Sequence, residues 1–170
     1  SVLAKPAEQT PLIAAQGIAI LLEAGVPPGV VQLLPGRGET VGAQLTGDER
    51  VRGVMFTGST EVATLLQRNI ASRLDAQGRP IPLIAETGGM NAMIVDSSAL
   101  TEQVVIDVLA SAFDSAGQRC SALRVLCLQD EIADHTLKML RGAMAECRMG
   151  NPGRLTTDIG PVIDGEAKTN

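Results

Sequence analysis

The feature that most constrains the fold is a regular alternation along the chain. Short apolar runs at residues 53–56, 82–85 and 123–128 have the length and composition of buried strands. Between such runs, longer segments such as 8–24 and 101–113 carry apolar residues at the spacing of one helix face. Strands that alternate with helices predict a parallel sheet flanked by helices. We therefore expect a protein of the α/β class.

Glycine and proline divide the remaining sequence into further elements of the same two kinds. The first predicted helix stops at Gly25, which is followed by Pro27 and Pro28. Further strands are expected at 2–4, 30–34 and 92–95, and further helices at 37–45, from the turn at 57–59 to about 73, and at 131–147. Neither end of the sequence carries a polar linker, so we expect the chain to be part of a larger protein.

Composition excludes several classes of function. Aromatic residues make up 1% of the chain and the net charge is -5, which leaves neither stacking platforms nor a basic stripe for a nucleic acid. No apolar run is long enough for a membrane span. The three cysteines include no CxxC pair, so neither a disulfide framework nor a metal site is expected. Free thiols indicate a reducing, cytoplasmic location.

Two segments are candidates for binding a nucleotide. Thr57-Gly58-Ser59 connects a predicted strand to a helix, where free N–H groups favour a phosphate, although an ordinary capped turn explains the same residues. Lys5 and Glu8 follow the first strand and are able to bracket a ribose diol, although a solvated pair at a helix start is also consistent. A carboxylate at that position disfavours a 2′-phosphate and therefore favours NAD over NADP.

Two further residues are candidates for catalysis. Glu86 ends the apolar run 82–85, where partial burial would suit a general base, and a loop carboxylate without a role fits equally. Cys120 lies in a segment of small residues beside Arg119, whose charge favours a thiolate. A lone cysteine is also often an inert small hydrophobe, a role that suits Cys127 on its apolar strand. His135 is expected on an exposed helix face, so a Cys–His pair is not favoured.

Taken in order, these segments resemble the aldehyde dehydrogenase superfamily over essentially the whole chain. The matching segments are Lys5-Pro-Ala-Glu-Gln-Thr-Pro11, Glu23-Ala-Gly-Val-Pro-Pro-Gly29, Phe56-Thr-Gly-Ser-Thr60, Glu86-Thr-Gly-Gly89, Gly117-Gln-Arg-Cys120 and Ile159-Gly-Pro-Val162. The resemblance implies an aldehyde dehydrogenase-like fold in two parts. Residues 1–89 would form part of an NAD-binding Rossmann-like domain with a parallel sheet, and 90–170 the beginning of the α/β catalytic domain that carries the nucleophile.

The resemblance also implies a role for each candidate residue. Cys120 would attack the aldehyde carbon, and Glu86 would deprotonate the water that hydrolyses the resulting thioester. The residues that would bind NAD are Lys5, Glu8, Gly36, Thr57, Gly58, Ser59, Thr87 and Gly88. Ser121, next to the nucleophile, would bind the carboxylate of the substrate.

Three segments resemble one subfamily more closely, the L-glutamate γ-semialdehyde (pyrroline-5-carboxylate) dehydrogenases of bifunctional proline-utilisation proteins. They are Ile84-Ala-Glu-Thr-Gly-Gly-Met-Asn91, Ser115-Ala-Gly-Gln-Arg-Cys-Ser-Ala-Leu-Arg124 and Leu155-Thr-Thr-Asp-Ile-Gly160. Many relatives have lysine where Met90 stands, a departure that suits this subfamily. The implied reaction is the NAD-dependent oxidation of L-glutamate γ-semialdehyde to L-glutamate in proline catabolism. Aldehyde dehydrogenases with another substrate, and a non-catalytic nucleotide-binding module, are the alternatives.

The resemblance also sets the expected partners. The family's Pro-Trp-Asn and Glu-Ile-Phe-Gly-Pro motifs are absent from this sequence. Because the Asn of the first motif stabilises the oxyanion, the isolated chain is expected to be a weak or inactive catalyst. The expected partners are a small aldehyde substrate, the remainder of the aldehyde dehydrogenase fold and further copies in a homo-oligomer, with no nucleic acid, membrane or metal bound by this segment.

Overall fold

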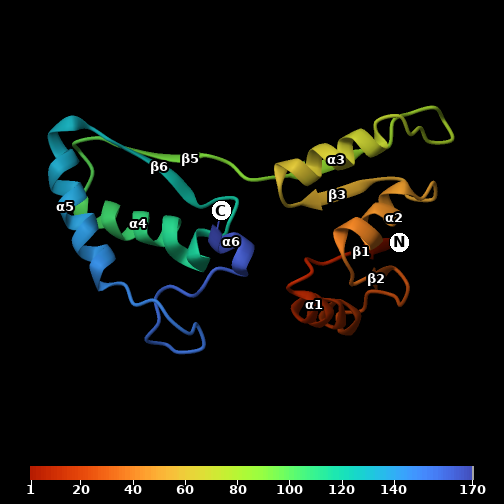
Figure 1. Ribbon diagram of the computed structural model, residues 1–170, viewed down its shortest axis with the longest axis horizontal. Helices are drawn as coiled ribbons and strands as arrows, with labels where there is room; N and C mark the ends of the chain where they lie inside the picture. Colours follow the sequence, from red (N-terminus) through yellow and green to blue (C-terminus); the bar gives the residue numbers. More distant parts are fainter. Residues whose placement is uncertain (170) are drawn as a thin grey trace. The chain divides into compact units, whose positions relative to one another are not determined.

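The computed structural model describes residues 1–169 and divides the chain into two compact units. The first unit is Ser1–Glu86, and the second begins at Thr87 (Figure 1). Each contains parallel strands and helices, so the predicted α/β class is confirmed. The domain boundary predicted after residue 89 stays a prediction. Among the described residues, no helix is both long and apolar enough to cross a membrane.

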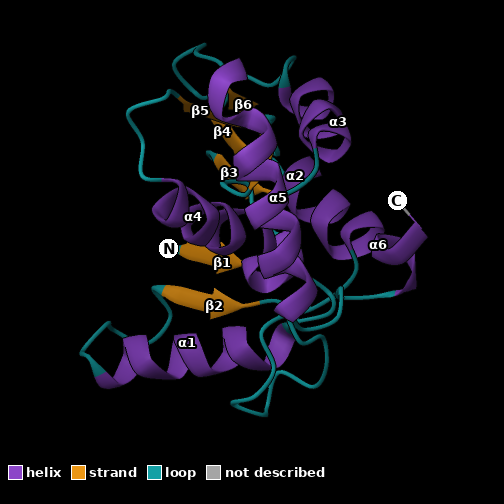
Figure 2. Ribbon diagram, turned by 90° about the vertical axis from the view of Figure 1, so that its left-hand side faces the viewer, coloured by secondary structure: helices purple, strands orange, loops and turns teal. Residues whose placement is uncertain are grey.

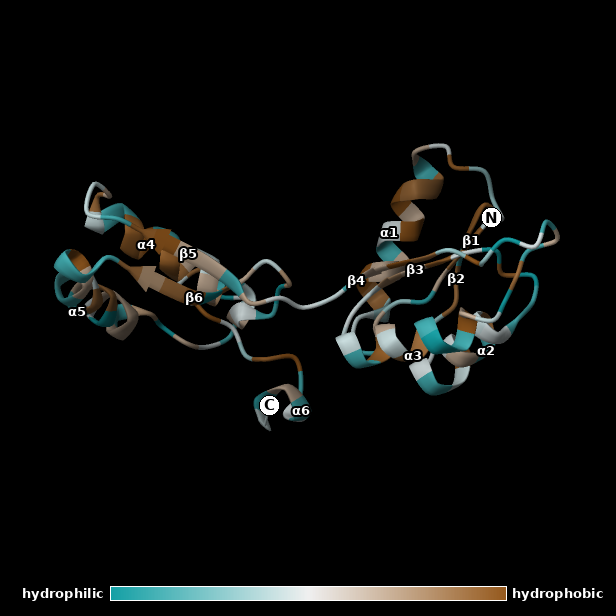
Figure 3. Ribbon diagram, turned by 90° about the horizontal axis from the view of Figure 1, so that it is seen from above, coloured by the Kyte–Doolittle hydropathy of each residue, from teal (hydrophilic) through white to brown (hydrophobic). Residues whose placement is uncertain are grey.

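The first unit contains two pairs of parallel strands. In one pair β1 (Val2–Ala4) lies beside β2 (Val31–Leu33), and in the other β3 (Val54–Thr57) lies beside β4 (Leu83–Glu86). The helices are α1 (Pro11–Glu23), α2 (Ala43–Gly47) and α3 (Thr60–Ile70), with a π-helical turn η1 (Gly38–Gly42) before α2. Figure 3 shows the strands between α1 on one side and α2 and α3 on the other.

Local chemistry explains where the helices of this unit begin and end. Proline stands at the start of α1, where its missing N–H costs nothing, and Gly25 ends the helix with φ +95°. Ser59 caps α3, because its Oγ accepts a hydrogen bond from the Val62 N–H at 3.2 Å. The structure shows α3 ending at Ile70 and not near residue 73, since the Arg73 guanidinium binds the backbone carbonyls of residues 46, 48 and 51 instead.

Apolar burial in the first unit is uneven. Ile70 is 1% exposed, and Ala63 and Ile81 are also buried. Helix α1 contributes no buried residue, and its Leu12 and Ile13 are 84% and 71% exposed. The core of this unit is therefore built around α3 and the segment before β4, while α1 keeps a large apolar surface free among the described residues.

The second unit has one pair of parallel strands and a better-developed core. Strand β5 (Asn91–Val95) pairs with β6 (Leu123–Leu128). Its helices are α4 (Thr101–Phe113), the 3-10 turn η2 (Asp114–Gly117), α5 (Asp130–Glu146) and α6 (Gly165–Thr169) (Figure 2). The buried core joins both strands to α4 and α5; its members are Val95, Val104, Val105, Val108, Leu123 and Leu140.

The strands of this unit bury only one of their two faces. Met93, Val95, Leu126 and Leu128 pack with the helices, whereas Ile94 on the alternate face is 85% exposed. This alternation follows from the two-residue repeat of a strand. The strand predicted at 123–128 and the helix predicted at 101–113 are confirmed with the same bounds.

Candidate active site

Cys120 is an exposed residue in the middle of a hydrogen-bonded turn of the second unit. The Ala122 N–H donates to the Arg119 carbonyl at 3.2 Å, which closes the turn, and Ala122 itself is fully buried. Cys120 and Ser121 are therefore the two central residues, whose N–H groups a turn of this kind leaves unused. Within residues 1–169 neither N–H donates to another residue. The thiol thus lies beside two free backbone donors, an arrangement suited to a developing negative charge.

The side chain of Asn91 holds this turn from the start of β5. Its Nδ2 donates to the carbonyl of Cys120 at 2.7 Å and to the carbonyl of Ala122 at 3.0 Å. These two bonds join residues 29 and 31 positions apart in the sequence. The turn at residues 119–122 is therefore fixed by a side chain from another strand as well as by its own backbone bond.

The segment before the turn adopts an unusual backbone. Ser115, Ala116 and Gly117 all have left-handed φ angles, of 55°, 54° and 69°. Such angles are unfavourable for residues that carry a Cβ, so surrounding contacts must hold them. The Gln118 side chain donates to the Ser115 carbonyl at 2.9 Å, and the Arg124 guanidinium donates to the Gly117 carbonyl at 2.6 Å.

A β-bulge directs Arg124 to this segment. Asn91 pairs with Leu123, and the next residue, Ala92, pairs with Val125, so Arg124 has no partner in the ladder. An extra residue in one strand changes the direction of its side chain, and bulges are common beside active sites for this reason. The bulge therefore directs Arg124 to Gly117, just before the turn at residues 119–122 that Asn91 binds.

The neighbours of Cys120 in the sequence are also exposed. The Arg119 guanidinium donates to the Ala110 carbonyl at 3.0 Å and lies 4.0 Å from the Asp114 carboxylate. The guanidinium is therefore held against the last turn of α4 and the residue that follows it. Ser121, the predicted ligand of the substrate carboxylate, is exposed in the same turn.

The other thiols differ from Cys120 in their surroundings. Cys127, expected to be an inert small hydrophobe, lies on the uncovered face of β6 and is exposed, and its inertness stays a prediction. Cys147 is half-buried, and its Sγ donates to the Ala143 carbonyl at 3.5 Å. His135 is exposed on α5, as predicted.

In the first unit, four of the predicted residues gather at the carboxyl ends of β3 and β4. Thr57 pairs with Glu86 in the parallel register, and the Gly58 N–H donates to the Glu86 carbonyl at 3.1 Å. A Cβ at Gly58 would lie 2.5 Å from the tip of the Phe56 ring, so any other residue there requires that ring to move. Ser59 follows as the cap of α3, whose first N–H groups are available to an anion.

A second group of predicted residues surrounds the turn η1. The Gly38 N–H donates to Glu8 Oε1 at 2.6 Å, which brings the end of β1 to the start of η1. The aliphatic part of Lys5 lies against Gly42, since a Cβ there would be 3.6 Å from Lys5 Cδ. At Gly36 a Cβ would overlap the Val41 side chain. Lys5, Glu8 and Gly36 therefore form one local group.

One expectation about Glu86 is corrected. The apolar run before it predicts a buried strand, but β4 has no fully buried residue and Glu86 is exposed. Ile84 in the same strand is 54% exposed because its face has no cover among the described residues. Thr87 and Gly88 follow in the connection to β5, with Thr87 half-buried and Gly88 exposed.

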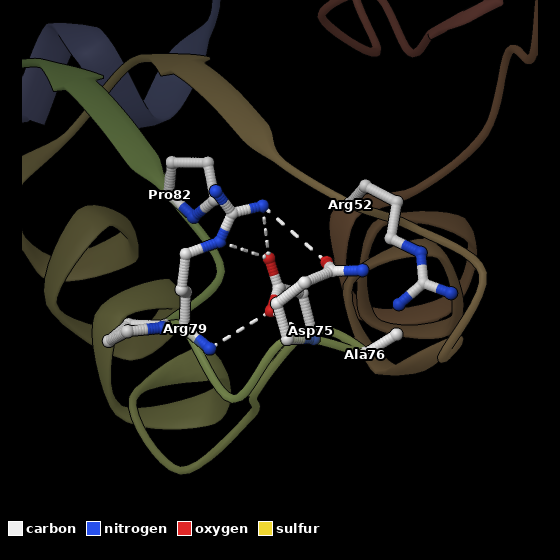
Figure 4. Close-up of a pocket in the computed structure, with 7 residues that line it drawn as sticks. Arg52, Asp75, Ala76, Arg79 and Pro82 are labelled. Atoms are coloured by element: carbon white, nitrogen blue, oxygen red, sulfur yellow. Dashed lines mark hydrogen bonds and ion pairs between the residues drawn. The ribbon is translucent and has the colours of Figure 1, made fainter.

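One hollow of the described surface lies away from these residues. A cavity of about 620 Å³ is lined by Arg52, Asp75, Ala76, Gln77, Arg79, Pro80 and Pro82. These residues precede β3 and β4, so the hollow lies at the opposite ends of those strands from Thr57 and Glu86. Figure 4 shows Arg79 turned toward Asp75, where backbone and guanidinium hydrogen bonds from Arg79 hold the pKa of Asp75 below its ordinary value.

Three residues that matter for the site were not singled out from the sequence. Asn91, Gln118 and Arg124 all lie inside the segments that carry the subfamily resemblance. Their polar side chains within otherwise small or apolar segments were the available signal. No group of three or more potential metal-binding side chains occurs within residues 1–169.

Comparison with known proteins identifies the family. The family model described as "Aldehyde dehydrogenase family" matches residues 1–170. The chain is 98% identical over 170 residues to "Bifunctional protein PutA" of Escherichia coli and spans 13% of its length. It is 38% identical over 164 residues to "1-pyrroline-5-carboxylate dehydrogenase" of Bacillus cereus, of which it spans 32%.

A solved structure agrees with these relatives. The 1-pyrroline-5-carboxylate dehydrogenase from Thermus with bound NAD is 36% identical, with a TM-score of 0.88. The match covers 99% of this chain and 33% of the Thermus chain. The resemblance drawn from the sequence motifs is thus confirmed, and the chain belongs to the aldehyde dehydrogenase family.

Proposed function

We propose that this chain supplies the catalytic cysteine and part of the NAD site of an enzyme that oxidises L-glutamate γ-semialdehyde to L-glutamate. The observation that carries the proposal is the Cys120 turn, in which an exposed thiol lies beside two free N–H groups. The names of the relatives from Escherichia coli, Bacillus cereus and Thermus support this substrate. Because the chain spans a small part of each relative, the activity belongs to the longer protein.

The chemistry at Cys120 follows from its position. The thiolate adds to the aldehyde carbon, a C–S bond forms, and the aldehyde oxygen becomes an oxyanion. The N–H groups of Cys120 and Ser121 are the donors available to that oxyanion. Loss of hydride from the same carbon leaves a thioester. Water deprotonated by Glu86 then attacks the thioester, the C–S bond breaks, and the carboxylic acid is released.

The residues of the first unit fit a dinucleotide. NAD, when bound, accepts the hydride that the thiohemiacetal carbon releases. Gly58 keeps the end of β3 free of a side chain, and the capped start of α3 suits the pyrophosphate. Lys5 and Glu8 would bind the adenosine ribose, with Gly36 beside the adenine. Thr57 in the first unit, and Thr87 and Gly88 at the start of the second, complete the proposed set.

The experiment uses a full-length chimera, in which this chain replaces the matching segment of the Escherichia coli relative. NADH formation from L-glutamate γ-semialdehyde is measured, and turnover is expected. C120A should abolish it, whereas C127A, which removes another exposed thiol, should not. E86Q should slow hydrolysis and leave a thioester adduct on Cys120 detectable by mass spectrometry.

The alternatives predict different outcomes. S121A should raise KM for the semialdehyde and leave KM for butyraldehyde, which has no carboxylate, unchanged. A chimera that turns over butyraldehyde with the higher kcat/KM would indicate an aldehyde dehydrogenase of another specificity. NAD binding without turnover of any aldehyde would indicate a non-catalytic nucleotide-binding module.

A further inference from the structure

The nucleophile turn depends on a donor that the proposed chemistry does not use. The turn offers its free N–H groups only if the peptide units on both sides of Cys120 keep their orientation. One backbone bond closes the turn, from Ala122 to Arg119 at 3.2 Å. The other two bonds to the segment come from the Asn91 side chain, at 2.7 and 3.0 Å. Outside the strand ladder, Asn91 therefore supplies two of the three hydrogen bonds made by the backbone of residues 119–122 within the described structure.

The peptide geometry shows what these bonds determine. In a trans peptide the C=O and the following N–H point in opposite directions. Because Asn91 binds the carbonyl of Cys120, the N–H of Ser121 is directed away from Asn91. The bond to the Ala122 carbonyl fixes the end of the turn where β6 begins. The same side chain thus sets the direction of one free donor and anchors the turn to the sheet.

We propose that Asn91 is a positioning residue for the Cys120 nucleophile. It acts through the turn, by holding the carbonyls of Cys120 and Ala122 so that the thiol and the adjacent N–H groups share one fixed arrangement. This inference rests on the proposed function, since it assigns a purpose to the same site. The bulge opposite Asn91 serves the same segment, because it lets Arg124 bind the Gly117 carbonyl at 2.6 Å.

Two variants of Asn91 in the full-length chimera test the proposal. N91A removes the donor, and N91D keeps the shape but sets a carboxylate against two carbonyl oxygens. We expect kcat to fall roughly ten- to a hundredfold in N91A and further in N91D, with KM for NAD within about twofold of the parent. The matched control is Q103A, which removes an exposed amide that donates to Asp107 on α4 and should leave kcat unchanged.

A second measurement needs neither aldehyde nor NAD. Iodoacetamide labelling of the three cysteines is followed by mass spectrometry. The fixed N–H groups favour negative charge on the nearby sulfur, so N91A should slow labelling of Cys120 by roughly fivefold or more. Labelling of Cys127 and Cys147 should not change, because their surroundings do not include Asn91. If the parent chimera lacks aldehyde oxidation, the proposed function fails, while this measurement still tests the turn.

Two results would overturn the proposal. Values of kcat and of the Cys120 labelling rate within twofold of the parent in both variants would mean that the turn holds without Asn91. Faster labelling of Cys120, Cys127 and Cys147 together would mean that Asn91 stabilises the whole unit, with no specific part in orienting the nucleophile.

Discussion

Replacement of Gly117 by alanine tests the backbone that precedes the nucleophile turn. Gly117 is buried and has φ +69°. An added Cβ would lie 2.7 Å from the Ala112 carbonyl oxygen and 3.3 Å from an Arg124 guanidinium nitrogen. The first contact is with backbone at the end of α4, which cannot rotate away as a side chain does. Alanine at this position is therefore unfavourable for two reasons, the left-handed φ angle and the steric overlap with the Ala112 carbonyl.

The magnitude follows from these two effects. A left-handed residue with a Cβ costs about 1 kcal/mol relative to glycine. Relief of the overlap with the Ala112 carbonyl adds about 1–3 kcal/mol, as overpacking of a core usually does. We expect G117A to lower the free energy of unfolding by about 2–4 kcal/mol. Weakening of the 2.6 Å bond from Arg124 to the Gly117 carbonyl would place the result toward the upper end.

The second unit offers a matched control for the same substitution. Gly142 lies inside α5, and a Cβ there would meet nothing within 4 Å. G142A should therefore raise stability by about 0.5–1 kcal/mol, the usual gain from alanine in a helix. Urea unfolding of the chain is followed by far-ultraviolet circular dichroism, since it has no Trp or Tyr for fluorescence. A G117A midpoint equal to the parent's would refute the left-handed geometry and the close contact with α4.

Three further substitutions follow from other contacts. S59A should lower stability by about 1 kcal/mol, because Ser59 caps α3, while S59G should cost only a few tenths; urea unfolding measures both. T136V should raise stability by about 1 kcal/mol, because the Thr136 hydroxyl is buried without a partner among the described residues. Asp75 has a lowered pKa, chiefly because the Arg79 backbone N–H binds it, so its stabilising effect is present above the unfolded pKa of about 3.9 and is lost as pH falls through the lower folded pKa. D75N should remove that part of the acid dependence in melting temperatures measured across this range.

Local periodicity predicted most of the fold because it reflects which face of an element is buried. Helix α4 and strand β6 were predicted with their observed bounds, since each has one buried apolar face and a clear stop. The apolar run 82–85 also predicted a buried strand before Glu86, and there the prediction is wrong; Cys127, on another apolar strand, is exposed as well. Among the described residues, no element packs on the strand faces that carry these residues. Whether a strand face is packed against another element depends on segments far away in the sequence, which local periodicity does not report.

The candidate site was only partly predictable for a related reason. Cys120 was identified because a thiol within a small-residue segment is chemically distinctive. The left-handed angles of Ser115 and Ala116 carry no local signal, because neither residue favours them. They depend on hydrogen bonds from the Gln118 and Arg124 side chains to the Ser115 and Gly117 carbonyls. Arg124 points to Gly117 because of a register shift between β5 and β6. Such pairings are decided by tertiary structure.

A hydrogen bond across 45 residues affects the order in which the site is assembled during synthesis. The Ile163 N–H donates to Gln118 Oε1 at 2.8 Å, and the same side chain donates to the Ser115 carbonyl. A ribosome adds residues in order at about 5–20 per second, so Gln118 waits several seconds for residue 163 to emerge. Helix α5 lies wholly within that interval and is complete first. During synthesis, the Gln118 side chain therefore lacks this hydrogen bond until well after α5 is complete.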